Sequence, residues 1–231
     1  MSKIRLNKAL KEIASRRAAE EIIFAGRVCV NGEVELKPQT MVEEEDEIAV
    51  DGKPLKKQER KVYFLLNKPA GYICTAKEGP SKRVLDLFRN LPYRLFTVGR
   101  LDRETSGLLL VTNDGDFANQ IAHPSFNIQK EYLVKTAQDI TDEHLKLLSR
   151  GTLVQRTVVR PISVKKVRRG TLKIVVGEGK KHEVRLLIQA AGLTLLDLNR
   201  IRVGSLNLDK MALGSFRELS IKELAFFNAR P

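Results

Sequence analysis

Strand-like apolar segments outnumber helical ones from residue 61 onward, and the two kinds do not alternate regularly. The patterns predict strands over 62–66, 95–98, 108–112, 132–135, 162–167, 172–176 and 195–203, and helices over 116–122, 142–149 and 183–191. A parallel sheet built from βαβ units needs a regular strand–helix alternation, which this order lacks. The sequence therefore predicts an α+β fold with a mixed, largely antiparallel sheet.

The first 52 residues follow a different pattern, which predicts a small separate module. Its expected elements are helices over 4–14 and 16–25, followed by strands over 28–30 and 46–50. Ser15 is a candidate N-cap for the second helix, and Gly26 is expected to end that helix in a left-handed conformation. Asn31 and Gly32 suit a tight turn after the first strand because both tolerate positive φ.

Residues 53–60 contain a proline and five charges, with Leu55 as their apolar residue, so we expect a linker there. Two domains suit a chain of 231 residues. The expected organisation is a module over 1–52, a linker over 53–60 and a larger domain over 61–231.

The net charge of +13 makes a polyanion the leading candidate partner. Residues 1–60 hold 12 Lys and Arg against 12 Asp and Glu, so residues 61–231 hold the remaining 29 and 16 and carry the whole excess. Nucleic acid fits better than a membrane surface, because the chain has no Trp and no basic amphipathic helix with an aromatic anchor face. The larger domain is therefore expected to hold most of the polyanion.

A cytoplasmic protein with no membrane partner is expected. No stretch approaches the roughly 18 consecutive apolar residues of a spanning helix, and the first residues lack an apolar export signal. Cys29 and Cys74 lie in separate segments without metal-ligand spacing, which favours two small core residues.

A polar segment bracketed by Gly99 and Gly107 is the candidate catalytic loop. It lies between two predicted strands, so a rigid apolar support would hold its side chains. Asp102 is the group in it that could carry chemistry. The alternative from composition alone is a carboxylate that is ion-paired with Arg100 or Arg103.

Five segments of the chain together resemble the signature motifs of a known family. They are Gly99-Arg-Leu-Asp102-Arg-Glu-Thr-Ser-Gly107-Leu-Leu-Leu, Thr112-Asn-Asp-Gly115, Lys130-Glu-Tyr132, the turn Lys68-Pro-Ala-Gly71, and Gly179-Lys-Lys-His-Glu-Val-Arg185. These are similar to the RNA pseudouridine synthases of the RsuA/RluB/RluE/RluF branch. The resemblance implies a bacterial enzyme that isomerises uridine to pseudouridine in RNA.

The N-terminal module resembles the S4 RNA-binding domain, which many members of that branch carry. The matching segments are Arg5-Leu-Asn-Lys8-Ala-Leu10, Ser15-Arg-Arg17 and Ala25-Gly-Arg-Val-Cys-Val-Asn-Gly32. The resemblance implies an RNA-binding cluster formed by Arg5, Lys8, Arg16, Arg17 and Arg27. We expect the acidic run over 43–47 to lie away from the RNA.

The resemblance implies that Asp102 is the essential carboxylate and that the reaction needs no cofactor and no metal. Whether Asp102 attacks C1′, adds to the ring at C6 or removes a ribose proton stays open, and each route needs an ionised, well-placed aspartate. Arg185 is the expected partner that keeps this carboxylate charged.

The other expected substrate contacts are with the uracil base and with the RNA backbone. Tyr132 would stack on the flipped uracil, with Lys130 on the same face of its strand, and Val184 would pack on the opposite face of the base. Arg100 would fill the space that the base leaves, or hold a phosphate.

The expected partner is ribosomal RNA or a ribosome assembly intermediate, with the large subunit favoured and a monomer assumed. Two other functions compete with this interpretation. One is a non-catalytic, ribosome-associated RNA-binding protein that uses the S4 module. The other is a metal-dependent nuclease or phosphotransferase that uses Asp114 and Asp116, although the run from Asn113 to Asp116 is more typical of a turn and a helix cap.

Overall fold

The computed structural model describes residues 3–43, 45–55, 60–154, 157–177, 179–180 and 182–228. By their internal contacts the residues form two compact units, Met1–Arg60 and Lys61–Pro231. No helix in the described ranges is long and apolar enough to span a bilayer.

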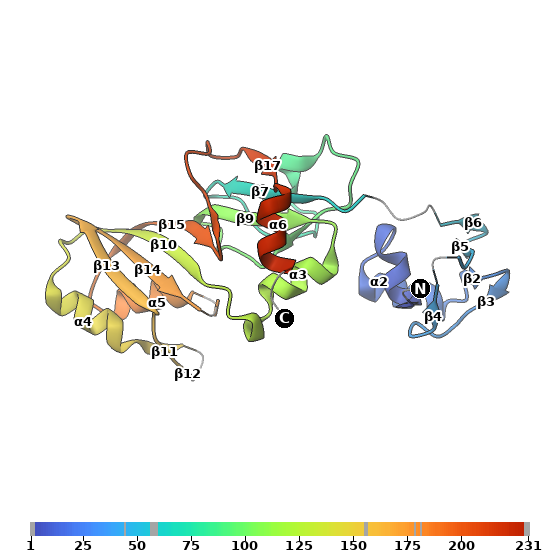
Figure 1. Cartoon of the computed structure of the whole chain (residues 1–231), viewed down its shortest axis with the longest axis horizontal. Coiled ribbons are helices and arrows are strands. Elements are labelled where there is room, and N and C mark those ends of the chain that lie inside the picture. The colour runs from blue at the N-terminus through green and yellow to red at the C-terminus, as the bar shows by residue number, and fades with distance from the viewer. Residues whose placement is uncertain are drawn as a thin grey trace. The chain divides into compact units, whose positions relative to one another are not determined.

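The small unit consists of two short helical segments against short strands (Figure 1). Its elements are β1 (Ile4–Arg5), α1 (Leu6–Ala9), the 3-10 helix η1 (Leu10–Glu12), α2 (Arg16–Phe24), β2 (Val28–Val30), β3 (Glu33–Val34), β4 (Met41–Val42), β5 (Ile48–Val50) and β6 (Lys53–Pro54). Strands β3, β2, β5 and β6 form one sheet in that order, and β1 pairs with β4. The core contains Leu6, Leu10, Ala14, Ala19, Ile23, Val28 and Val42.

The sequence predicted the second helix and its start correctly, and it placed the end at Ala25, one residue beyond Phe24. The Ser15 hydroxyl accepts a hydrogen bond from the backbone N–H of Ala18 at 3.3 Å, and Ala19 and Ile23 are fully buried. Gly26 has a φ of 70°, as the left-handed end of the helix requires.

Two predictions for this unit were wrong in extent. The helix expected over 4–14 begins only at Leu6, because the backbone of Ile4–Arg5 pairs with Met41–Val42 as β1 and β4. The linker expected over 53–60 begins later, since β6 pairs with β5 and the Leu55 N–H donates to the Ile48 carbonyl at 2.7 Å. Residues 56–59 of that linker lie outside the described residues.

The large unit is built on one mixed sheet. Its strands are β7 (Tyr63–Lys68), β8 (Phe96–Val98), β9 (Ser106–Thr112), β10 (Lys130–Thr136), β13 (Ser163–Arg168), β14 (Thr171–Val176), β15 (Leu195–Val203), β16 (Leu206–Asn207) and β17 (Phe216–Glu218), and a separate hairpin holds β11 (Thr152–Val154) and β12 (Thr157–Val159). The order is β13-β14-β10-β15-β9-β7-β17, with β16 on β15 and β8 on β9. Every pairing is antiparallel except that of β9 with β15, which confirms the predicted sheet type.

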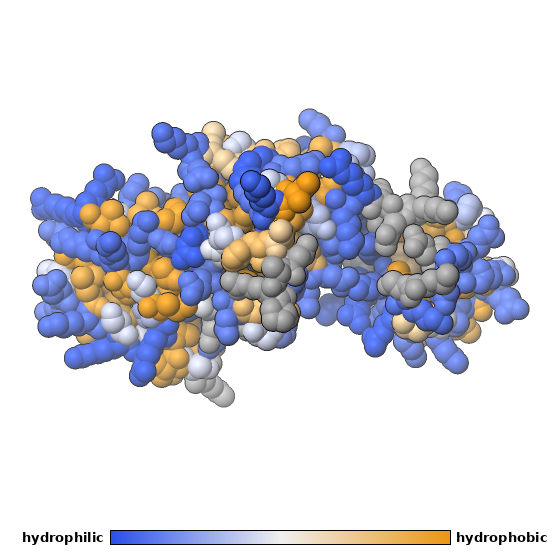
Figure 2. Space-filling view, viewed as in Figure 1, coloured by the Kyte–Doolittle hydropathy of each residue, from blue (hydrophilic) through white to orange (hydrophobic). Residues whose placement is uncertain are grey.

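Helices pack on the sheet of the large unit (Figure 1). They are η2 (Val84–Phe88), α3 (Gly115–Ala122), η3 (Pro124–Phe126), α4 (Asp142–Arg150), α5 (Glu183–Ala190) and α6 (Ile221–Asn228). Helices α4 and α5 pack toward the β13–β14 end, and α3 and α6 pack on β9. Figure 2 shows hydrophilic residues over most of the visible face, with apolar residues gathered over the part that carries β13, β14 and α4.

The parallel junction of β9 and β15 fixes the middle of the sheet. Ser106 pairs with Asn199, and Gly107 pairs with Arg200. Gly107 has a φ of 108°, and a Cβ atom on it would lie 2.3 Å from the Arg200 carbonyl oxygen. Gly107 was expected to close a loop, but it lies inside β9, and its missing side chain lets the two backbones meet.

Candidate active site

The segment between β8 and β9 (residues 99–105, the Asp102 loop) rests on a buried lysine. Lys68, at the end of β7, is fully buried, and its Nζ donates to the carbonyls of Pro69 at 2.9 Å, Arg103 at 3.3 Å and Thr105 at 2.8 Å. Burial lowers the pKa of this lysine, while nearby Cys74, Glu104 and Asp102 act in the opposite direction. The sequence placed Lys68 in a turn, but the residue lies in β7, and its side chain connects the Asp102 loop to the sheet.

The Asp102 carboxylate is paired with two residues at the start of α5. Its Oδ2 lies 3.4 Å from Nε of Arg185, and its Oδ1 lies 3.3 Å from Nε2 of His182. The Arg185 guanidinium also donates to the Thr105 hydroxyl at 2.9 Å. The side chain of Asp102 is 36% exposed, so it is open to a ligand from one side.

The alternative that composition suggested, an ion pair of Asp102 with Arg100 or Arg103, does not form between these described residues. Arg103 lies 3.6 Å from Glu104 instead, with both side chains exposed. Arg100 is exposed and faces the pocket that Asp102 lines.

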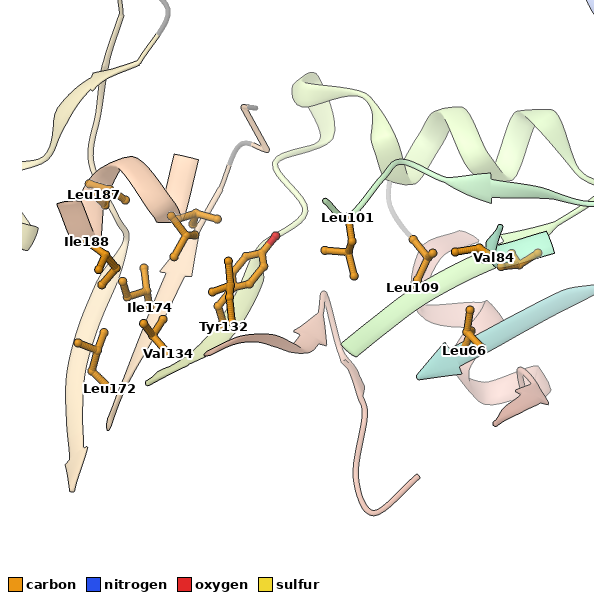
Figure 3. Packing of buried hydrophobic residues seen from close by; sticks show 14 of the residues in the cluster. Leu66, Val84, Leu101, Leu109, Tyr132, Val134, Leu172, Ile174, Leu187 and Ile188 are labelled. Atoms are coloured by element: carbon orange, nitrogen blue, oxygen red, sulfur yellow. The ribbon is translucent and has the colours of Figure 1, made fainter. Parts of the chain in front are cut away.

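A cavity of about 290 Å³ lies beside this carboxylate, between the Asp102 loop, β10, β15 and the start of α5. All six residues expected to act in the larger domain line it: Arg100, Asp102, Lys130, Tyr132, Val184 and Arg185. Tyr132 is 8% exposed, and Val184 is 4% exposed. Figure 3 shows the Tyr132 ring in a row of buried side chains, with Leu101 on one side and Val134 on the other.

Two cations, the buried Arg200 and the half-buried Lys130, face the same cavity. Arg200 is 6% exposed, and its Nε donates to the Leu108 carbonyl at 2.7 Å. Burial lowers the pKa of Lys130, and the positive charge of Arg200 lowers it further, against the opposite effect of Glu183. The cavity thus combines apolar side chains with charged ones, which suits an aromatic base attached to an anionic backbone.

Comparison with known families identifies the class of protein that has this pocket. The family model described as RNA pseudouridylate synthase matches residues 62–190, more than half of the chain, and the S4 domain model matches residues 4–48. The chain belongs to the RNA pseudouridine synthase family.

Relatives of this pseudouridine synthase match it over nearly its whole length. A putative chloroplastic ribosomal large subunit pseudouridine synthase of Arabidopsis thaliana is 45% identical over 95% of this chain, and the match spans 59% of the plant protein. Ribosomal large subunit pseudouridine synthase B of Bacillus subtilis is 38% identical, over 92% of this chain and 89% of its own. A crystal structure of a pseudouridylate synthase superposes with a TM-score of 0.70, at 27% identity, over 97% and 99% of the two chains.

The five basic residues expected to contact RNA in the S4 unit are all exposed: Arg5, Lys8, Arg16, Arg17 and Arg27. Arg27 is held by Asp51, with its Nε 2.8 Å from Oδ1, in the turn after β5. Arg16 lies 3.8 Å from Glu20, one turn along α2. Glu43, the first residue of the acidic run, pairs with Lys3 at 2.9 Å.

Asp114 of this synthase caps a helix, as its sequence context predicted. Its Oδ1 accepts from the backbone N–H groups of Asp116 and Phe117, and its Oδ2 lies 2.8 Å from Lys61 Nζ. Within the described ranges, no group of three or more His, Cys, Asp and Glu is placed to hold a metal ion. The Asp114 carboxylate is engaged in the helix cap and in the contact with Lys61, as the turn-and-cap interpretation expects.

Sequence reasoning missed four residues that shape the site: Lys68, Thr105, His182 and Arg200. The sequence pattern could have indicated Arg200. It lies on the same strand face as the buried Leu198, where a charged residue is unusual. The motif containing His182 was recognised, but nothing in it showed that the imidazole would reach Asp102.

Proposed function

We propose that this pseudouridine synthase isomerises a uridine of ribosomal RNA, with large-subunit RNA as its substrate. The observation that carries the proposal is that the Asp102 carboxylate and the Tyr132 ring line one cavity. The large subunit is favoured because the Arabidopsis and Bacillus relatives carry large-subunit names. A non-catalytic RNA-binding protein is not favoured, since it would have no use for this pocket.

The reaction breaks the N1–C1′ bond of the uridine, turns the uracil and joins C5 to C1′, while C5 loses a proton and N1 gains one. In our proposal Asp102 is the essential carboxylate, and the Arg185 guanidinium is its ion-pair partner. The Arg185 position supports this role, because its guanidinium is fixed by the Thr105 hydroxyl on one side and faces the carboxylate on the other.

The flipped base would lie in the cavity between Tyr132 and Val184. The half-buried Lys130 is two residues from Tyr132 on the same strand face, and no described residue makes a hydrogen bond or ion pair with its Nζ. Lys130 would therefore meet a polar atom of the uridine or its phosphate. Arg100, at the exposed rim, would hold the backbone or fill the space that the base leaves.

The enzyme would act as a monomer in the cytoplasm, on naked RNA or on an assembly intermediate. Removing a base from its stack costs a few kcal/mol, so an RNA loop or a strand not yet covered by ribosomal proteins is the favoured target.

The direct test is incubation of the purified protein with unmodified large-subunit and small-subunit ribosomal RNA, in a chelator, followed by pseudouridine mapping at nucleotide resolution. We expect one or a few stoichiometric sites in the large-subunit RNA. Sites in the small-subunit RNA alone would overturn the subunit assignment. Tight RNA binding with no pseudouridine in either RNA, or in precursor particles, would overturn the enzymatic proposal.

RNA binding by the S4 unit is expected to depend on salt through its exposed arginines. Replacing both Arg16 and Arg17 with Gln should reduce the slope of log Kd against log salt by about 1.5, since each phosphate contact contributes about 0.7 to 0.9. Lys3→Gln is the matched control, because Lys3 pairs with the acidic run. An equal change of slope in both variants would show a general charge effect and no specific contact.

A further inference from the structure

His182 stands immediately before α5 in a conformation that histidine seldom adopts. Its φ of 59° and ψ of 18° lie in the left-handed region, and its side chain makes no capping hydrogen bond to the helix. Non-glycine residues in this region carry strain and cluster at functional sites, where the surrounding structure holds them.

The turn that carries His182 is fixed by a reciprocal pair of hydrogen bonds. The backbone N–H of Lys180 donates to Oε2 of Glu183 at 3.1 Å, and the backbone N–H of Glu183 donates to the Lys180 carbonyl at 3.1 Å. Glu183 is only 5% exposed, so this pairing is largely shielded from water. The left-handed residue is therefore a fixed feature that directs an imidazole toward the Asp102 loop.

The imidazole and Arg185 contact different oxygens of one carboxylate. Nε2 of His182 lies 3.3 Å from Oδ1, and Nε of Arg185 lies 3.4 Å from Oδ2. Of the residues that the structure describes, these two bring side-chain donors to the Asp102 carboxylate. Without His182, the carboxylate could rotate about its last bond while Arg185 stays in place.

We propose that His182 is a positioning residue for Asp102, with its Nε2–H donating to Oδ1 and fixing the plane of the carboxylate that faces the uridine. At 3.3 Å the contact is long, and such contacts commonly shorten when substrate binds. This inference rests on the proposed role of Asp102 and adds the group that orients it. A small error in the placement of a reacting group can cost a large factor in rate.

Two substitutions of His182 distinguish the effect of its contact with Asp102 from the effect of its strained backbone. His182→Gly removes the imidazole, and glycine takes the left-handed conformation without strain, so the fold should be kept. His182→Gln places an amide nitrogen at the same number of bonds from Cα as Nε2, so it can restore the donor.

The kinetic test measures the single-turnover rate on the mapped RNA site and the Kd for that RNA. His182→Gly should lower the rate by about 10- to 100-fold with Kd within about twofold of wild type. His182→Gln, or imidazole added to the Gly variant, should recover most of the rate. A Gly variant as fast as wild type overturns the proposal, and so does a loss that appears in Kd alone or that neither rescue relieves.

A second test does not depend on activity, so its failure is distinct from failure of the proposed function. The chain has three histidines, His123, His144 and His182. In imidazole ¹⁵N spectra, Asp102→Asn should shift the signals of His182 and leave the other two in place, because His123 contacts Ser125 and His144 contacts Thr141. Unchanged His182 signals would show that the contact does not exist in solution, and the proposal would fail.

Discussion

Asp102→Asn is expected to abolish pseudouridine formation while leaving RNA binding intact. The amide has the shape of the carboxylate but no negative charge, so it can neither attack a carbon nor accept the ribose proton. Loss of a single essential group of this kind costs about 10⁴-fold or more in rate. The measurement is the single-turnover yield of pseudouridine on ribosomal RNA, with the Kd for the same RNA determined in parallel.

Glu104→Gln is the matched control for this substitution. Glu104 is a carboxylate in the same loop, but its side chain is 68% exposed and pairs with Arg103 on the surface. Its removal should change the rate by about twofold at most, since exposed ion pairs contribute little. An Asp102→Asn enzyme that keeps a tenth of the wild-type rate would contradict the assigned role, as would an equal loss in both variants.

Gly107→Ala is expected to destabilise the sheet strongly. A methyl group there would lie 2.3 Å from the Arg200 carbonyl oxygen and 2.6 Å from Oδ1 of Asn199, at a φ that alanine rarely adopts. The parallel contact of β9 with β15 would have to open. We expect a loss of about 4 kcal/mol or more from the free energy of unfolding.

Gly115→Ala provides the comparison for that loss. Gly115 begins α3, and a Cβ atom there would meet nothing within 4 Å. Alanine is the better helix former, so this variant should be as stable as wild type or slightly more so. Urea unfolding of the full chain, followed by circular dichroism, measures both. Equal stability of the two variants would contradict the tight junction described at Gly107.

The sequence was sufficient to predict the kind of sheet and most strands of the larger unit, because its apolar runs and Gly or Asn turns agree with each other. It was insufficient where tertiary contacts override local pattern. The run Lys68-Pro69-Ala70-Gly71 is typical of a turn, yet Lys68 continues β7, where it pairs with Gly107 of β9 and its Nζ donates to three carbonyls. The short β6, β16 and β17 have too few residues to show a pattern of their own.

The residues that line the pocket were predicted better than the contacts among them. Asp102, Tyr132 and Arg185 were expected together because their motifs resemble those of one family, and the structure brings all three to one cavity. The contact of His182 with Asp102 depends on a left-handed backbone at one residue, and residue type does not predict that. Arg103 is next to Asp102 in sequence, but its side chain points to solvent, where it pairs with Glu104.

The central claim is that the target uracil lies against Tyr132 in the cavity beside Asp102. The most direct measurement places 4-thiouridine at the mapped position of the RNA, binds it to the Asp102→Asn protein and identifies the photocrosslinked peptide by mass spectrometry. The account predicts crosslinks to residues 130–134 or to the Asp102 loop. If the crosslink forms on Tyr132 itself, it should disappear when Tyr132→Ala is added to the Asp102→Asn protein. Crosslinks confined to the S4 unit or to α4 would contradict it.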